Sequence, residues 1–294
     1  LENDKETAIA AVTQAGQNAS VAIGQLQPLN LSEIKAYKQQ ITDAVNDATT
    51  KINGETTATA VSTDQTNATT AISGIQATAT LQNSREDADN QLLNHGQAAK
   101  NKIAAMPDLT TTQINQANSD IDKAVQDGQA AINGSQNTTD INSALATGEG
   151  NVNNVTATAQ SQSDNAVSNA KTSATSAINT AAAAAKAAID NMQPMSTTEK
   201  ATFKGQVDSA ATAANNAIQG EKTVAAITAV QTNGLTAISN QQAAATLQNA
   251  KEDSVNQLKA YAQSGRTSLT KLPNLTDTQS DQANQSITTA VTNG

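Results

Sequence analysis

Apolar residues recur along this chain at alternating intervals of three and four residues, which is the spacing of one face of an α-helix. The first such run comprises Ile9, Val12, Gly16, Ala19, Ile23 and Leu26, and similar runs follow over 34–52, 58–75, 114–132 and 141–155. No alternation of period two survives beyond a few residues. The pattern therefore predicts helices that pack at shallow angles, and no strands.

Prolines and glycines divide these runs in a regular way. Each of the four prolines, Pro28, Pro107, Pro194 and Pro273, is followed by an N-cap residue and, three positions later, by Glu or Gln. These pairs are Asn30/Glu33, Thr110/Gln113, Ser196/Glu199 and Thr276/Gln279. The spacing is that of a capping box, so it predicts a helix start at each pair. We expect Gly54, Gly134 and Gly220 to end three of these helices as glycine C-caps.

The chain also repeats itself. Pro28 and Pro194 are 166 residues apart, as are Pro107 and Pro273, and at this offset residues 1–128 align with residues 167–294 without gaps. Each half contains two similar stretches, which predicts an array of helical repeats. We define repeat 1 as residues 1–76, repeat 2 as 77–155, repeat 3 as 156–242, and a partial repeat 4, with two helices, as 243–294.

Each complete repeat consists of a helix, a proline turn, a helix, a glycine turn and a third helix, which predicts an antiparallel three-helix bundle. Nothing breaks the chain between the third helix of one repeat and the first helix of the next. Residues 55–106 should thus form one helix of about 78 Å. The predicted fold is all-α, with tandem antiparallel three-helix bundles joined end to end by long shared helices into an elongated rod. We expect residues 243–294 to be the least ordered part.

Composition agrees with a narrow bundle. Ala accounts for 57 of the 294 residues, whereas Leu, Ile, Val and Phe make up about 16%, below the roughly 20% level under which a chain is normally disordered. A net charge of −9 is too small to complete the signature of a disordered chain. Composition alone leaves disorder and a thin repetitive fold both open, and the helical periodicity favours the second. With no Trp, one Phe and two Tyr, a wide core is excluded.

The composition also argues against several classes of function. The chain has no Cys, its pI is near 4.6, and its 17 basic residues are scattered among 26 acidic ones. These features argue against thiolate metal sites, nucleic acids and anionic membranes as partners. No apolar run reaches the length of a membrane span. Because no catalytic motif occurs either, we expect no enzyme activity, no cofactor, no metal and no small-molecule substrate.

One stretch of repeat 3 carries a family resemblance. It contains Lys186-Ala187-Ala188-Ile189-Asp190, Pro194, Ser196-Thr197-Thr198-Glu199-Lys200 and Val230-Gln231-Thr232-Asn233-Gly234-Leu235-Thr236-Ala237-Ile238. This pattern resembles the Ala- and Thr-rich helical repeat, a domain of unknown function associated with FIVAR modules, of giant Gram-positive cell-wall surface proteins. These include staphylococcal extracellular-matrix-binding and biofilm-associated adhesins. The resemblance implies an extracellular, wall-attached stalk of which this chain is an internal segment.

A few residues stand out as candidates for a site. His95 is the only histidine, and Tyr261 occupies the matching position at the 166-residue offset, which indicates a packing position. Two charged triplets, Arg85-Glu86-Asp87 and Lys251-Glu252-Asp253, favour a solvated helix face with local ion pairs over an ion-binding patch. Tyr37 and Phe203 also coincide at this offset and are interpreted as large core residues in an Ala-rich bundle. None of them is predicted to be a catalytic, cofactor or metal residue.

The leading functional hypothesis is a stalk or spacer that projects a binding region from a bacterial cell wall and supports adhesion or biofilm. A second hypothesis is a binding module whose bundles attach to host extracellular-matrix or serum proteins, with fibronectin- or albumin-like ligands. A third is self-association, in which Ala-rich faces of two chains pair side by side.

Overall fold

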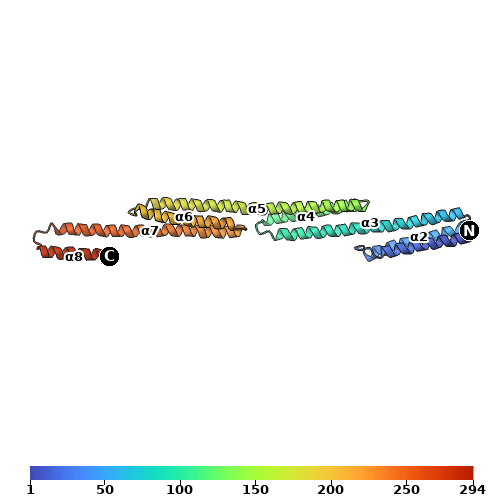
Figure 1. Cartoon of the computed structure of the whole chain (residues 1–294), viewed down its shortest axis with the longest axis horizontal. Coiled ribbons are helices and arrows are strands. Elements are labelled where there is room, and N and C mark those ends of the chain that lie inside the picture. The colour runs from blue at the N-terminus through green and yellow to red at the C-terminus, as the bar shows by residue number, and fades with distance from the viewer. Residues whose placement is uncertain (294) are drawn as a thin grey trace. The chain divides into compact units, whose positions relative to one another are not determined.

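The computed structural model describes residues 1–293, and within them every regular element is an α-helix (Figure 1). The helices are α1 (Glu2–Ile23), α2 (Leu31–Gly54), α3 (Ala58–Ala104), α4 (Thr111–Gly134), α5 (Thr138–Asp190), α6 (Thr197–Gly220), α7 (Val224–Leu269) and α8 (Asp277–Asn293). The predicted all-α fold is confirmed. The uninterrupted helix expected over 55–106 is α3, whose 47 residues span about 70 Å.

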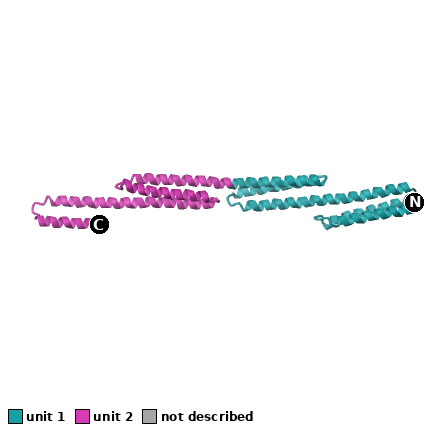
Figure 2. Ribbon diagram, in the orientation of Figure 1, with its two compact units in different colours: residues 1–163 teal, residues 164–294 magenta. Residues whose placement is uncertain are grey.

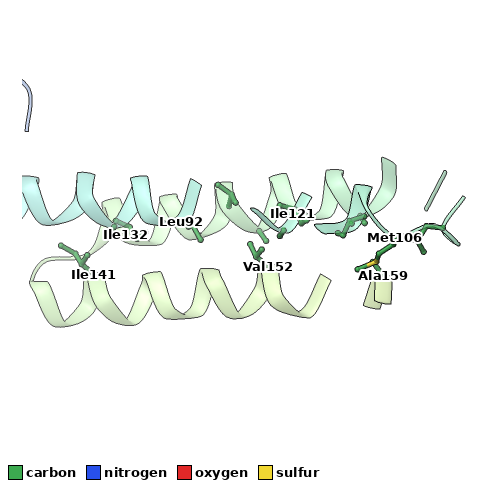
Figure 3. Packing of buried hydrophobic residues seen from close by; sticks show 14 residues of the cluster. Leu92, Met106, Ile121, Ile132, Ile141, Val152 and Ala159 are labelled. Atoms are coloured by element: carbon green, nitrogen blue, oxygen red, sulfur yellow. The ribbon is translucent and has the colours of Figure 1, made fainter. Parts of the chain in front are cut away.

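The chain forms two compact units, residues 1–163 and 164–294, and α5 contributes to both (Figure 2). The first unit contains two hydrophobic clusters. One is formed by α1, α2 and the N-terminal part of α3, around Ile23, Ile41 and Ile72. The other is formed by the C-terminal part of α3, by α4 and by the beginning of α5. In Figure 3 the labelled side chains of this second cluster, among them Leu92 and Ile121, converge between the three helices. The two bundles of this unit therefore share α3.

The second unit contains one cluster, formed by the end of α5, by α6 and by the first part of α7, around Ile178, Val207 and Ile238. Beyond it, the C-terminal part of α7 contacts α8 and forms a helical hairpin. No residue of α8 between Asp277 and Asn293 is buried. Two helices can cover only one side of each other, so the hairpin buries much less apolar surface than the bundles do.

All four predicted capping boxes are present. At α2, α4 and α6 the N-cap side chain accepts a hydrogen bond from the N3 amide, and the N3 side chain accepts one from the N-cap amide. Before α8, Thr276 N donates to Gln279 Oε1 at 3.0 Å and Gln279 N donates to Thr276 Oγ1 at 3.3 Å. Each box satisfies two amides that have no partner inside the helix. These local bonds fix where the second helix of every repeat begins.

The predicted glycine C-caps are wrong. Gly54, Gly134 and Gly220 are the last helical residues of α2, α4 and α6, and no glycine among residues 1–293 has a positive φ. The next residue takes the cap position with extended backbone in each case, as at Glu221, where φ is −73° and ψ is 151°. The chain leaves these helices directly into the next turn, so the left-handed residue of a Schellman or αL motif is not needed.

One interior layer shows how the three bundles vary the sizes of the residues that meet between the helices. In each bundle this layer contains the residue eighteen positions before the N-cap of the second helix, the residue eighteen positions after it, and one small residue of the third helix. The layers are Val12/Ala48/Ala68, Leu92/Gly128/Gly148 and Ile178/Ala214/Gly234, and all nine residues are buried. A larger first-helix residue thus accompanies smaller residues on the other two helices, as constant packing density requires.

The C-terminal glycine of α6 offers a simple test of the corrected cap. A Cβ at Gly220 meets nothing within 4 Å, and its backbone is helical. We expect Gly220→Ala to stabilise the chain by about 0.4–1 kcal/mol, because Ala lowers the conformational entropy of the unfolded chain. Urea unfolding followed by circular dichroism measures this change. A loss of stability would contradict the helical conformation at this residue.

Gly234→Ala should have the opposite effect. The added Cβ would lie 2.5 Å from Ala214 Cβ and 2.7 Å from Ile178 Cδ1. We expect a net loss of about 1–2 kcal/mol, because overpacking costs about 1–3 kcal/mol and Ala regains up to about 1 kcal/mol of helix propensity. The same unfolding measurement applies, with Gly220→Ala as the matched control.

Adding Ile178→Val to Gly234→Ala recreates the Val, Ala, Ala layer of repeat 1 and should recover part of the lost stability. If the two substitutions were simply additive, the compensation between the layer residues would be refuted.

Candidate functional site

No group of three or more His, Asp or Glu side chains among residues 1–293 is arranged to hold a metal ion. In the same part of the chain, no helix has an apolar stretch long enough to span a bilayer.

His95 lies on α3 and is half-buried. Its Nε2 atom is 3.0 Å from Oδ1 of Asn153 on α5, so the ring takes part in the contact between two helices of repeat 2. Tyr261, at the matching position of α7, is 76% exposed. The prediction that both are packing positions is wrong for Tyr261, because among residues 1–293 the C-terminal part of α7 pairs with α8 in a two-helix hairpin that leaves the ring exposed.

The triplet Arg85-Glu86-Asp87 does not act as a unit. Arg85 donates from Nη2 to the carbonyl oxygen of Ser135, the C-cap residue of α4. Lys5 makes the equivalent bond to the Asn53 carbonyl at 2.9 Å, and Lys171 to the Gln219 carbonyl at 2.8 Å. A basic side chain from the first helix thus satisfies a carbonyl at the end of the second helix in all three bundles, where it also interacts favourably with the helix dipole.

Glu86 and Asp87 lie in different surroundings. Burial raises the pKa of Glu86 above its usual value of 4.5, a hydrogen bond from Gln82 opposes this, and the nearby Glu33 carboxylate raises it further. Gln82 Nε2 donates to Glu86 Oε1 at 3.0 Å, whereas the exposed Asp87 accepts from Gln91 Nε2 at 2.8 Å. Neighbouring positions on a helix point about 100° apart, which explains the separation.

The second triplet begins with the exposed Lys251, and its Glu252 lies beside the capping-box residue Glu199. Gln248 Nε2 is 2.9 Å from Glu252 Oε1 and 3.5 Å from Glu199 Oε1. Hydrogen bonds, first of all from the Ser196 hydroxyl at 2.5 Å, lower the pKa of Glu199. Each triplet thus places one glutamate beside a capping-box glutamate. Gln248 bridges the two carboxylates in the second case, and Gln82 binds only Glu86 in the first.

Asp89, one turn after Arg85, has a raised pKa as well. Burial is the main cause, and a hydrogen bond from Asn133 Nδ2 at 3.2 Å works against it. Asp89 and Glu86 therefore both favour a proton in the folded state of the first unit.

Tyr37 and Phe203 occupy the same place in two bundles, seven residues after the N-cap of the second helix. Both are half-buried and pack against the hydrophobic clusters of their bundles. The corresponding residue of repeat 2 is Ala117, again seven residues after its N-cap. Where the aromatic ring is missing, a groove of about 420 Å³ lies between α4 and α5, with Ala117 among its lining residues.

This groove was not predicted from the sequence. Its signal was the absence of an aromatic residue at one of three equivalent positions, and such an absence becomes visible only when the repeats are aligned by their N-caps. The groove thus accompanies a difference of sequence between repeat 2 and repeats 1 and 3.

The raised pKa of Glu86 predicts a pH dependence. Since the folded chain binds this proton more readily than the unfolded chain, the stabilisation is fully present below about pH 4.5 and is lost as the pH rises through the raised pKa. We expect Glu86→Gln to be more stable than the wild type at neutral pH and to differ less from it near pH 4.5. Thermal unfolding of both chains across this range is the measurement. A Gln variant that is less stable at neutral pH would contradict the assignment.

Comparison with known proteins connects this arrangement to a family. Residues 4–80, 84–160 and 161–246 each match the family described as Domain of Unknown Function (DUF1542), one that occurs as repeats in Gram-positive surface proteins. Neither a curated protein nor a solved structure matches the chain. The three matches follow one another across most of the sequence, and each contains one of the hydrophobic clusters described above. The chain belongs to the DUF1542 family and carries three consecutive copies of its repeat.

Proposed function

We propose that the chain is a stalk or spacer segment of a bacterial cell-surface adhesin, which projects a binding region from the cell wall and supports adhesion or biofilm. The observation that carries this proposal is α3, a single helix of 47 residues that contributes buried side chains to two successive clusters. A helix shared in this way leaves no flexible linker between the two bundles. Stiffness between neighbouring repeats is what a spacer requires.

The interior of the bundles supports the same proposal. In the layer Val12/Ala48/Ala68 and its counterparts, two of the three helices contribute only Ala or Gly, so the helices approach closely and the bundle is narrow. The side chains at the surface are mainly Thr, Asn, Gln and Ser, with few charges. Because such a surface has few charges, its electrostatic interactions change little with ionic strength. This suits a segment that is exposed to variable salt concentrations.

The family supports the location, because these repeats occur in surface proteins. We propose that the chain is extracellular and attached to the cell wall through the protein of which it is a part. We also propose that it has no catalytic role, since the bundles devote their interior to apolar contacts between helices. Attachment to a host matrix or serum protein is the alternative function, and the groove in repeat 2 is the feature that supports it.

Small-angle X-ray scattering of the complete chain tests the spacer. We expect a maximum dimension well above about 80 Å, because α3 alone spans about 70 Å. A maximum below about 80 Å would contradict a spacer. As a control, Gln82→Pro places a helix breaker in the middle of α3, and the resulting bend should shorten the maximum dimension and broaden the distance distribution.

A further inference from the structure

The groove in repeat 2 lies between two helices of the first compact unit. Ala117 of α4 and Val155 and Ala159 of α5 supply its apolar surface, and its volume is about 420 Å³. Its polar lining comes from amide, hydroxyl and carboxylate side chains such as Gln113 and Asp120. Ala117 and Ala159 are both buried, so the apolar surface is the floor of the groove.

The other two bundles show what fits at this place. In repeat 1 the equivalent position is Tyr37, which packs against the same cluster as Ile75, the counterpart of Val155. In repeat 3 it is Phe203, which packs against the cluster around Val207. Two of the three bundles thus carry an aromatic ring of their own at the position of Ala117. In repeat 2 this position lines the groove between the second and third helices, and the ring is missing.

A second difference concerns charge. Asp120, ten residues after the N-cap of α4, is the one ionisable side chain that lines the groove. Repeats 1 and 3 have Gln40 and Gln206 at this position and carry a carboxylate at Glu33 and Glu199 instead, where repeat 2 has Gln113. Gln116 Nε2 donates to Asp120 Oδ1 at 2.9 Å and orients the carboxylate. The nearby Lys123 pairs with Asp127 at 2.8 Å instead, so the negative charge at the groove is not neutralised by that lysine.

From these two differences we propose that the groove of repeat 2 is a docking site for another protein, which inserts an aromatic side chain that has a Lys or Arg next to it. The ring occupies a volume like that of Tyr37 and Phe203 in the sister bundles. It buries its apolar surface against Ala117, Val155 and Ala159. The neighbouring cation lies within reach of Asp120. This site is independent of the spacer function, because a spacer is equally well served by a filled groove.

The affinity of a single ring is low. One aromatic anchor with one ion pair at a solvated rim corresponds to a dissociation constant of about a millimolar. A partner that reaches high occupancy therefore adds contacts outside the groove, and the experiment has to detect weak binding.

The test uses the complete chain labelled with ¹³C at the methyl groups of valine and at the δ1 methyl of isoleucine. The probe is the peptide acetyl-Gly-Tyr-Lys-Gly-amide, followed through the methyl signals of Val155, which are assigned with Val155→Ile. Two comparison peptides replace Tyr by Ala or Lys by Glu. We expect saturable shifts at Val155. The affinity of the peptide should fall about tenfold when Ala replaces Tyr and about threefold when Glu replaces Lys. Asp120→Asn should abolish the preference for Lys over Glu.

Variants with a matched change in the sister bundle complete the design. Ala117→Phe supplies the missing ring from within, and we expect it to remove binding at Val155. Ala117→Tyr serves the same purpose if the Phe variant fails to keep the helical circular dichroism spectrum. Conversely, Tyr37→Ala should open an equivalent groove in repeat 1, where binding of the peptide shifts the δ1 methyl signal of Ile75.

Two results would overturn the proposal. One is the absence of a saturable shift at Val155 in the wild-type chain. The other is a shift at Val155 that persists in both Ala117→Phe and Ala117→Tyr, because it would show that the peptide binds elsewhere. Neither result bears on the maximum dimension of the chain, so the docking site and the spacer function can fail separately.

Discussion

The close approach of three helices is the constraint on which the rest of this structure depends. At the layer described above, the side chains contain five carbons in repeat 1, four in repeat 2 and five in repeat 3, although no position keeps the same residue in all three. The total volume is nearly constant, whereas its distribution over the helices changes. At this layer the closely packed helices leave room only for Gly or Ala on two of the three helices. A chain that is poor in large apolar residues can therefore still have a packed interior.

The sequence was sufficient for features that depend on neighbouring residues. Helix starts followed from capping boxes, the long α3 from the lack of breakers, and the all-α fold from the heptad spacing. Features that depend on distant residues were not predictable. Arg85 bonds to Ser135, fifty residues away, and the exposure of Tyr261 depends on how many helices surround α7. The glycine caps failed for another reason, because a glycine at a helix end does not by itself determine the sign of its φ.

Internal repetition makes departures from the common pattern informative. Where three bundles share a backbone plan, a residue that differs at one equivalent position serves as a comparison built into the chain. Ala117 is such a residue, since the rings of Tyr37 and Phe203 show what the plan contains in the sister bundles. The groove therefore has an independent reference for its size, which a pocket in a protein without repeats does not have.

A helix that belongs to two cores also affects how the chain responds to mechanical load. The N-terminal part of α3 is held by Ile41 and Ile52 of α2, and its C-terminal part by Ile121 and Ile132 of α4. If one bundle melts, α3 loses half of its burial, so the neighbouring bundle is weakened at the same time. Under shear flow, we expect such a pair to unfold at a higher force than two bundles joined by a flexible linker. Both bundles should then unfold together. Sharing a helix exchanges gradual extension for resistance followed by an abrupt release.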